Sequence, residues 1–412
     1  DNDGPLMASI EGEIQTEMGE NVAEVMVEVT GSNVFPDPTG LDGSFAIPNL
    51  PLGFNYTVIP EKDINPENGV TTWDMVLMTK HVLGVKYLDS PYKIIAADVN
   101  NSGTVTTMDV VELRKLILNI NETFPQNKSW RFVDKHHTFQ DPTNPFFPPY
   151  PEVMNVNNFT QDELEANFTG VKIGDLNDSA EPNSLVGSDD RSHLDDLILM
   201  VDNQSIRAKN EFKIEFRLKD IKTLFGWQFT LNFDESVLEF LEFEQGEIED
   251  LSEENFGWTH LNEGVITMSW FDLNPRKISE TERLFSLKFK SKTNAELTDL
   301  FNINSRYTLA EAYDENEELM NIKLEFGNEI SEESDAEFLL YQNQPNPFTE
   351  STLISFNLPE STQGTVTIFD VSGKVLRTFE GQFSEGYNEL RINKEDLKKN
   401  IALKKEILAH VS

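Results

Sequence analysis

Two twelve-residue stretches, residues 63–74 and 98–109, place oxygen-bearing side chains at the same offsets. Both carry Asp, Asn, Glu, Ser or Thr at offsets 1, 3, 5, 9 and 12. A calcium-binding loop uses this spacing to surround the cation with six to eight oxygen ligands. Each stretch leads into an apolar segment of helical periodicity, and no helical pattern precedes either one. We therefore expect two calcium-binding loops, each followed by a helix.

The sixth residue of such a loop must turn sharply with a positive φ. Glycine adopts this conformation freely, and asparagine adopts it more readily than most other residues. Gly103 holds the sixth place in the second stretch, and Asn68 holds it in the first. The alternative is a pair of turns that cap helices, because Asp, Asn and Thr are also good N-caps. Capping needs one such residue per helix, whereas each stretch has five at fixed offsets.

A duplicated loop and helix of this kind resembles the type I dockerin, and the similarity covers about residues 63–121. The resemblance implies two bound Ca²⁺ ions and a cohesin-type protein module as the partner. It also assigns the backbone carbonyls of Gly69 and Thr104 to the calcium shells. The side-chain ligands would be Asp63, Asn65, Glu67, Thr71 and Asp74 in the first loop, and Asp98, Asn100, Ser102, Thr106 and Asp109 in the second.

The same resemblance assigns offsets 10 and 11 of each loop to contacts with the partner. These residues are Thr72 and Trp73 in the first repeat, and Thr107 and Met108 in the second. Trp73 is the best anchor candidate, because buried tryptophan dominates many protein interfaces. The alternative, equally open on the sequence, is that Trp73 fills the core of the helical module.

Composition narrows the classes of partner. Of the 412 residues, 72 are acidic and 33 are basic, so the net charge is −39. Nucleic acid and anionic membranes require clustered Lys and Arg, so neither is expected as a partner. The lack of cysteine excludes a disulfide scaffold, thiol catalysis and Cys-type zinc sites. No stretch reaches the ~18 to 20 apolar residues that insertion into a membrane needs. Asp1–Pro5 has no signal-peptide pattern, so we expect the chain to begin inside a longer precursor.

Residues 1–62 alternate apolar and polar side chains in short runs that Gly, Asn, Asp and Pro separate. Val25, Val27 and Val29 illustrate the period of two, which predicts a small antiparallel β-sandwich. With its Asp-Gly-Ser-Phe turn at residues 42–45, the segment resembles the carboxypeptidase regulatory-like (transthyretin-like) module. In that family the module is a spacer without catalytic residues.

Residues 63–181 hold the dockerin-like module and an aromatic, proline-rich extension. The stretch Asn144–Pro151 has too many prolines for a helix and predicts an extended path. Phe146, Phe147 and Tyr150 could form a recognition strip or a sugar-stacking surface. The alternative, which we favour, is that they pack back onto the helices.

Residues 174–179 begin like a third calcium loop, with Asp, Asn and Ser at offsets 1, 3 and 5 from Asp175. The pattern then fails, because Ala180 stands at offset 6 and Val186 stands at offset 12. We therefore expect this segment to form a turn.

A linker rich in Ser, Asp and Gly at residues 182–196 precedes new strand patterns at residues 197–328. Their alternation predicts a second β-sandwich. Within it, Gly226–Phe240 is similar to the cohesin family and to related sandwiches of carbohydrate-binding modules. In those families a strand ends in Phe-Asp-Pro, and here Glu235 replaces the proline. We expect the inward-facing aromatic side chains to form a core and not a sugar platform.

An acidic linker at residues 329–338 leads to a last module at residues 339–412. Gln-Asn-Gln-Pro-Asn-Pro-Phe at residues 342–348 and Phe-Asp-Val-Ser-Gly-Lys-Val at residues 369–375 look like the type A sorting domain of the type IX secretion system. That route serves the Bacteroidota, and the resemblance implies secretion, trimming of the tail and surface attachment. Residues 397–411 depart from the family, because they read as a basic amphipathic helix in place of the final β-strand. We therefore expect this ending to be sorted poorly.

No nucleophile elbow, HExxH motif, Gly-rich phosphate loop or clustered histidine set occurs in the sequence. The predicted fold class is mainly β and multidomain, with three small antiparallel β-sandwiches and one α-helical module of duplicated loop–helix units. The predicted function is a non-catalytic, calcium-binding, secreted cell-surface assembly or adhesion protein that uses a dockerin–cohesin interaction. The alternative is the C-terminal accessory part of a secreted polysaccharide-degrading enzyme. Its catalytic domain would precede residue 1, and its ligand would be a polysaccharide.

Overall fold

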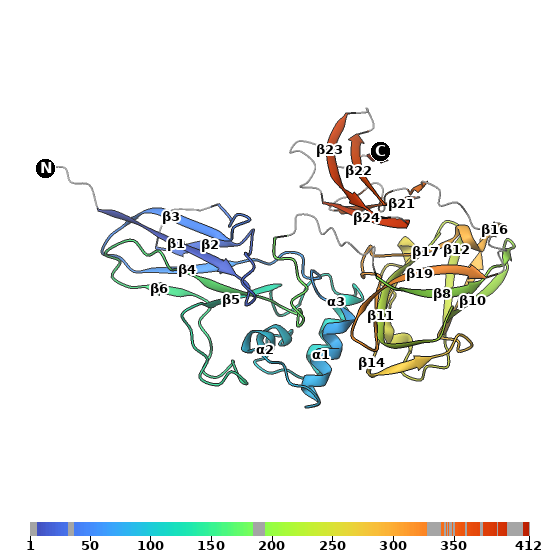
Figure 1. Ribbon diagram of the computed structural model, residues 1–412, viewed down its shortest axis with the longest axis horizontal. Coiled ribbons are helices and arrows are strands. Elements are labelled where there is room, and N and C mark those ends of the chain that lie inside the picture. Colours follow the sequence, from blue (N-terminus) through green and yellow to red (C-terminus); the bar gives the residue numbers. More distant parts are fainter. Residues whose placement is uncertain are drawn as a thin grey trace.

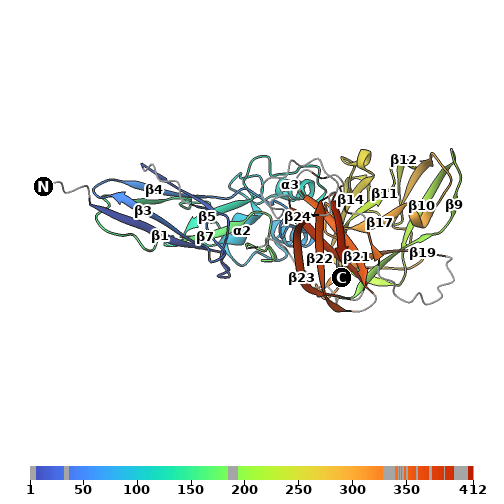
Figure 2. The same ribbon diagram turned by 90° about the horizontal axis from the view of Figure 1, so that it is seen from above.

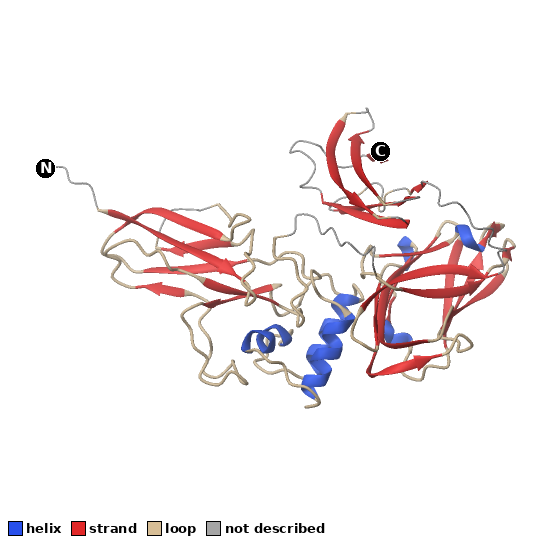
Figure 3. Cartoon of the chain, viewed as in Figure 1, coloured by secondary structure: helices blue, strands red, loops and turns tan. Residues whose placement is uncertain are grey.

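The computed structural model describes residues 6–31, 37–183, 194–327, 339–341, 343, 345, 348, 351–358, 361–370, 374–384, 386–393 and 407–411. Strands dominate these residues, as the predicted mainly β class requires. Two sandwiches lie at opposite ends of an elongated molecule, and the α-helices lie between them (Figures 1, 2 and 3). None of the described helices is long and apolar enough to span a membrane. The predicted acidic linker and most of the earlier linker fall outside the described residues.

The first sandwich consists of two sheets that share one apolar core. One sheet has the order β3–β1–β7–β5, and the other has the order β2–β4–β6. Their bounds are β1 (Met7–Gln15), β2 (Met26–Thr30), β3 (Ser44–Pro51), β4 (Tyr56–Glu61), β5 (Trp130–Asp134), β6 (Met154–Val156) and β7 (Phe168–Lys172). Buried and exposed side chains alternate along β2, so the period of two in the sequence corresponds to one buried face.

Three strands of this sandwich come from beyond residue 62, where the sequence predicted its end. β7 pairs in parallel with β1 and antiparallel with β5, and β6 pairs with β4. Trp130 and Phe168 are buried in the same core as Ile10. The helical segment is therefore inserted between strands of one sandwich. The local pattern could not indicate this, because the pairing joins residues that lie far apart in the chain.

The inserted segment forms three helices, α1 (Thr72–Val82), α2 (Pro91–Ala97) and α3 (Thr107–Ile117). Thr71 caps α1 and Thr106 caps α3, each in a reciprocal hydrogen-bond pair with the third residue of its helix, Asp74 or Asp109. The buried sides of the helices meet in one apolar cluster. α2 was not predicted, although its Ser-Pro start is a recognised helix signal.

The aromatic side chains of the proline-rich extension divide between two environments. Phe146 and Tyr150 pack against the apolar cluster of the helices, as does Phe139. Phe147 points to solvent and is 77% exposed. The favoured packing alternative therefore holds for Phe146 and Tyr150. A single exposed ring remains, which does not make a continuous sugar-stacking surface.

The second sandwich has Trp227 and Trp270 at its centre, with ring centroids 4.3 Å apart. Its long strands are β8 (Asp196–Asp202), β10 (Glu211–Leu218), β11 (Lys222–Phe233), β12 (Leu238–Gln245), β14 (Val265–Ile278), β15 (Phe285–Ser291) and β19 (Leu319–Gly327). Its short strands are β9 (Ser205–Ile206), β13 (Phe256–Gly257), β16 (Ala295–Glu296), β17 (Phe301–Asn304) and β18 (Glu311–Asp314). β8 and β19, the first and last strands, pair in parallel at seven positions. The inward-facing aromatic side chains form the core, as predicted.

The last module forms two three-stranded sheets, β20–β21–β24 and β23–β22–β25. The bounds are β20 (Leu339–Leu340), β21 (Ser351–Leu358), β22 (Thr362–Asp370), β23 (Val375–Phe383), β24 (Gly386–Asn393) and β25 (Ile407–Val411). The prediction that the chain ends in a helix is wrong, because β25 pairs with β22 from Val366↔Val411 to Asp370↔Ile407. Residues 397–406 of that predicted helix lie outside the described residues. Since the final strand covers the edge of β22, the structural reason to expect poor sorting disappears.

Because β5, β6 and β7 complete the first sandwich, a fragment of residues 6–62 should not fold. It would leave the edges of β1 and β4 unpaired and half of the core open to water. In thermal melts followed by circular dichroism, residues 6–183 should unfold cooperatively and residues 6–62 should show no transition. A cooperative transition in the shorter fragment would contradict the shared core.

Candidate functional site

The second predicted calcium loop, residues 98–109, closes on itself. The Asp98 carboxylate accepts backbone hydrogen bonds from Ser102 at 2.8 Å and from Gly103 at 2.8 Å. Gly103 has a φ of 78°, which is the predicted turn at the sixth residue. Burial raises the pKa of Asp98, and the facing Asp109 carboxylate adds to the rise, while hydrogen bonds from the loop backbone oppose it.

Asn100 provides a test of whether this loop suits a cation. The Asp109 carboxylate accepts backbone hydrogen bonds from Asn100 at 3.1 Å and from Thr106 at 2.8 Å, which joins the two ends of the loop. The side-chain Oδ1 of Asn100 is buried and has no hydrogen-bond partner. Leaving such a group unpaired costs about 1–3 kcal/mol. A calcium ion inside the loop would bind this oxygen, so the residues present fit the cation.

The other predicted loop spans residues 63–74. Side chains of its first half bind residues outside the loop. The Asp63 carboxylate accepts a hydrogen bond from the Ser129 backbone at 2.8 Å. Glu67 forms an ion pair with Arg391 at 3.6 Å. Among the described residues, no group of three or more Asp, Glu or His side chains is placed so that it could hold a metal ion. The three acidic ligands predicted for this loop, Asp63, Glu67 and Asp74, are therefore not gathered at one point.

The turn of the first loop also differs from the prediction. Positive φ angles occur at Asn65 (48°) and Gly69 (70°), and not at Asn68. The side chain of Asn68 instead pairs with the backbone of Glu181, through its Nδ2 at 2.9 Å and its Oδ1 at 3.1 Å. Gly69 takes the left-handed conformation because it has no Cβ to oppose it.

Asp74, at offset 12 of the first loop, is fully buried. Its Oδ2 accepts hydrogen bonds from the Thr71 backbone at 2.8 Å and the Thr71 hydroxyl at 3.0 Å, and its Oδ1 accepts one from the Leu176 backbone at 2.7 Å. Burial raises the pKa of Asp74 well above its ordinary value, and the nearby Asp175 carboxylate raises it further. Among the described residues, Asp74 and Asp175 have no third Asp, Glu or His beside them that would complete a metal site. A calcium ion here would therefore also need amide, hydroxyl and carbonyl oxygens.

Offsets 10 and 11 of the first repeat, Thr72 and Trp73, lie against the second sandwich of the same chain. They belong to α1, the helix that lies beside β11 and β14 in Figure 1. The backbone N–H and the hydroxyl of Thr72 donate to Gln228 Oε1 at 2.5 Å and 2.7 Å. Thr72 Oγ1 also lies 2.7 Å from Ser269 Oγ. The first turn of α1 is therefore hydrogen-bonded to β11 and β14.

Trp73 is 6% exposed and lies outside the apolar cluster of the helices. Its ring stacks on Tyr313 with centroids 5.4 Å apart, and it meets Phe225 edge-on at 5.3 Å. Lys80 Nζ lies 5.2 Å from the centroid of the Trp73 ring. Trp73 therefore anchors a contact with the chain's own sandwich, an arrangement that neither sequence alternative described.

The C-terminal end of α3 is bound by the same face of the sandwich. The Thr308 hydroxyl donates to the Ile117 carbonyl at 2.6 Å, and the Thr267 hydroxyl donates to the Leu118 carbonyl at 2.5 Å. The last carbonyls of a helix have no partner within the helix. The sandwich therefore satisfies groups that would otherwise need water.

The face of the sandwich that binds the helices is polar but buried. Gln228, Thr230, Thr267 and Ser269 are each at most 1% exposed. A sheet with one face in water would expose such outward side chains. The sequence could not reveal this interface, because outward polar residues look the same whether water or protein covers them.

The second repeat presents its equivalent residues to solvent. Thr107 is exposed, and Met108 is 55% exposed. The two repeats therefore differ at offsets 10 and 11, since the sandwich covers these residues in the first repeat and solvent reaches them in the second.

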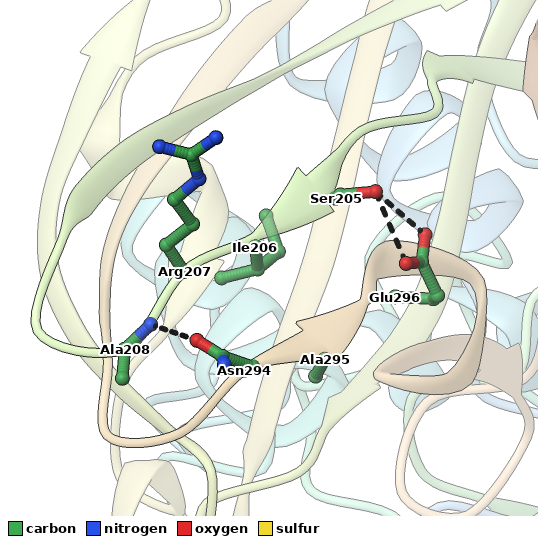
Figure 4. A pocket seen from close by; sticks show the side chains of 7 residues that line it. All are labelled: Ser205, Ile206, Arg207, Ala208, Asn294, Ala295 and Glu296. Atoms are coloured by element: carbon green, nitrogen blue, oxygen red, sulfur yellow. Dashed lines mark hydrogen bonds between the residues drawn. The ribbon is translucent and has the colours of Figure 1, made fainter.

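A shallow hollow between β9 and β16 offers no separate site (Figure 4). Four of its lining residues already pair with one another. The Ser205 hydroxyl donates to the Glu296 carboxylate at 3.0 Å, and the Ala208 backbone donates to Asn294 Oδ1 at 2.8 Å. We therefore assign no ligand to this hollow.

Comparison with known families matches three segments of the chain. Residues 61–128 match the dockerin type I domain, residues 199–322 match the cohesin domain, and residues 344–401 match the secretion system C-terminal sorting domain. No curated protein matches the chain.

Solved structures that are similar to part of this chain include cohesins. A type I cohesin–dockerin complex from Clostridium thermocellum is 15% identical over 32% of this chain and 94% of that chain, with a TM-score of 0.25. The seventh ScaB type I cohesin from Pseudobacteroides cellulosolvens is 17% identical over 32% and 86%, with a TM-score of 0.23. A non-cellulosomal cohesin from Archaeoglobus fulgidus is 14% identical over 31% and 86%, with a TM-score of 0.22.

The family matches agree with the module composition that the sequence predicted, and the sorting segment indicates a secreted or cell-surface location. The chain is therefore a multidomain secreted or surface protein that combines a dockerin type I segment, a cohesin segment and a type IX secretion sorting segment.

Proposed function

We propose that this protein is a non-catalytic, calcium-binding surface assembly protein whose dockerin-like helices bind the cohesin-like sandwich of the same chain. The observation that carries the proposal is the burial of Thr72 and Trp73 on β11, β14 and β18. Dockerin resemblance assigns these two residues to cohesin contact. The three matched segments are all of non-catalytic kinds.

Aromatic packing and hydrogen bonds both stabilise this contact. An aromatic pair such as Trp73 and Tyr313 contributes about 0.5–1.5 kcal/mol beyond its buried area. The Tyr313 hydroxyl donates to Thr71 Oγ1 at 3.0 Å, so the sandwich also binds the cap residue of α1. A buried tryptophan surrounded by satisfied polar groups is typical of an interface hot spot. These features favour a lasting contact that fixes how the helices are oriented on the sandwich.

The open repeat supplies the second half of the proposed function. Met108 and Val111 on the first turns of α3 are exposed. This surface is available to a cohesin-type module of another molecule. One repeat would then make the chain rigid, and the other would join it to a neighbour. Repeated head-to-tail contacts that do not close into a ring build extended assemblies.

Calcium supports this arrangement because both loops stand at the starts of the docking helices. We assign one ion to each loop–helix unit, and so two ions to the chain. α1 and α3 have 11 residues each, and isolated helices of this length are marginal in water. An ion that joins Asp98 to Asp109 would fix the start of α3. It would thereby help to hold the far end of α3 against the sandwich.

Replacing Trp73 tests the contact within the chain. Trp73→Ala should destabilise the docked state by about 3–5 kcal/mol, because it removes a large buried ring. We expect a lower melting temperature and, in small-angle X-ray scattering, a larger maximum dimension. Met108→Ala changes the equivalent exposed residue and should alter neither quantity. Unchanged melting and scattering for Trp73→Ala would contradict the proposal.

Replacing Asn100 tests calcium binding in the second loop. Since its buried Oδ1 has no protein partner, Asn100→Ala removes no hydrogen bond of this oxygen and should not lower the melting temperature in chelator. The same variant should bind calcium about tenfold more weakly or worse in isothermal titration calorimetry, since even indirect changes near metal sites cost that much. The stabilisation by calcium should fall accordingly. Equal calcium affinity in the variant and the parent would contradict this assignment.

We also assign the tail from residue 339 a role as a removable address for the type IX route, as the resemblance implies. Mass spectrometry of the protein released from the cell surface should find a C-terminus that precedes residue 339. Full-length protein at the surface would contradict this assignment.

A further inference from the structure

Two separate segments of the chain together repeat the pattern of the second calcium loop. Residues 175–180 read Asp-Leu-Asn-Asp-Ser-Ala, beside Asp-Val-Asn-Asn-Ser-Gly at residues 98–103. Residues 69–74 read Gly-Val-Thr-Thr-Trp-Asp, beside Thr-Val-Thr-Thr-Met-Asp at residues 104–109. Placed end to end, the two segments give all twelve offsets, with a break in the chain between offsets 6 and 7.

The first of these segments folds like the first half of the second loop. The Asp175 carboxylate accepts backbone hydrogen bonds from Ser179 at 3.1 Å and from Ala180 at 2.9 Å, through different oxygens. Asp98 makes the same two bonds to the residues at offsets 5 and 6 of its own loop. Offset 4 is left-handed in both cases, with φ of 60° at Asp178 and 56° at Asn101.

The second segment folds like the second half of that loop. Asp74 Oδ2 accepts bonds from the backbone and the hydroxyl of Thr71 at 2.8 Å and 3.0 Å. Asp109 Oδ2 accepts bonds from the backbone and the hydroxyl of Thr106 at 2.8 Å and 3.1 Å. Offsets 9 and 12 therefore have the same geometry in both places.

The two segments also meet as the halves of the second loop do. The Ser179 hydroxyl donates to the carbonyl of Gly69 at 3.1 Å, although these residues are 110 positions apart. In the second loop, the Ser102 hydroxyl donates to the carbonyl of Thr104, also at 3.1 Å. A Cβ on Gly69 would lie 2.4 Å from the backbone nitrogen of Ala180, so only glycine permits this approach.

The second carboxylate oxygen of the aspartate at offset 12 also has a similar hydrogen-bond partner in the two places. Asp74 Oδ1 accepts a bond from the Leu176 backbone at 2.7 Å, and Asp109 Oδ1 accepts one from the Asn100 backbone at 3.1 Å. The donor comes from offset 2 in the first case and from offset 3 in the second. In both places the carboxylate at offset 12 reaches across to the start of the loop.

Charge burial gives a further argument for a cation. Asp74 is 0% exposed and Asp175 is 8% exposed. Buried carboxylates require a cation or protonation, because desolvation of the charged form is costly. The nearby Lys172 Nζ donates to the carbonyls of Pro66 at 2.6 Å and Ile173 at 3.0 Å, and it forms no ion pair with either carboxylate among the described residues. A divalent ion between the two carboxylates would compensate both.

We propose that the first calcium ion binds a split loop, formed by residues 175–180 and 69–74, and not the contiguous loop of residues 63–74. This inference rests on the calcium-binding part of the proposed function. Its ligands would be the side chains of Asp175, Asn177, Ser179 and Asp74, with the carbonyl of Gly69.

The split loop gives calcium a structural role that a contiguous loop would lack. Asp175 follows β7 of the first sandwich, whereas Asp74 belongs to the first turn of α1. An ion bound to both would connect the sandwich directly to the helix that docks on the second sandwich. Calcium removal should therefore loosen the joint between the two ends of the molecule, in addition to weakening one loop.

The test compares offset 3 of the two candidate loops in the full chain. Asn177→Ala removes an exposed side chain at offset 3 of the split loop. Asn65→Gly removes the side chain at offset 3 of the contiguous loop. Glycine is used there because Asn65 has a positive φ, which glycine adopts freely. Calorimetric titration of the parent protein with calcium alone should show two ions. Asn177→Ala should weaken one of them about tenfold or more, and Asn65→Gly should leave both unchanged. Circular dichroism in chelator should show that both variants remain folded.

The outcomes separate this inference from the proposed function. If Asn65→Gly weakens an ion and Asn177→Ala does not, the first ion binds the contiguous loop and the split site is wrong. The parent could instead bind one ion, with an affinity that Asn100→Ala lowers and Asn177→Ala does not. In that case the split site is wrong, and calcium binding by the second loop stands. If the parent binds no calcium, both proposals fail.

Discussion

The parallel pairing of β7 with β1 is the contact on which the rest of the N-terminal half depends. It is short, since it joins Ile14 to Phe168 and Gln15 to Thr169. It nevertheless brings the chain back to the first sandwich after the helical insertion and buries Phe168 in the common core. The segment that follows β7 then lies beside the start of α1. One pairing therefore closes the sandwich, joins both ends of the insertion to it, and brings Asp175 close to Asp74.

The first turn of α1 connects two kinds of chemistry. Asp74 accepts hydrogen bonds on the side of the helix that faces the segment after β7. Thr72 and Trp73, its immediate neighbours, contact the second sandwich. A helical turn is rigid, so the position of the carboxylate and the position of the indole ring are linked. If an ion binds at Asp74 as proposed, metal binding and docking would be coupled through a few bonds of backbone, without any longer pathway.

Features that depend on neighbouring residues could be predicted from the sequence, and features that depend on distant pairing could not. The helices that begin after Thr71 and Thr106 depend only on nearby residues, and a helix was predicted after each loop. Thr71 and Thr106 themselves were predicted as calcium ligands, and the structure shows that they also cap these helices. β7 was missed because its place in a sheet is decided by β1 and β5. Residues 175–180 were recognised as the beginning of a loop but interpreted as a turn. A search for a contiguous twelve-residue loop requires residues 181–186 to complete the pattern, and they do not. The segment that matches the second half of the pattern, residues 69–74, comes earlier in the chain.

The parallel pairing of β8 with β19 has a mechanical consequence. These strands carry the two chain ends of the second sandwich, and they lie side by side at seven positions. A pull on the two ends of that sandwich acts along the strands in opposite directions. The hydrogen bonds between them would then be loaded in shear, all at the same time, and not opened one after another from an end. A surface protein attached through the end of the chain that follows β19, and pulled by flow, would load this sandwich in the direction in which it resists force most.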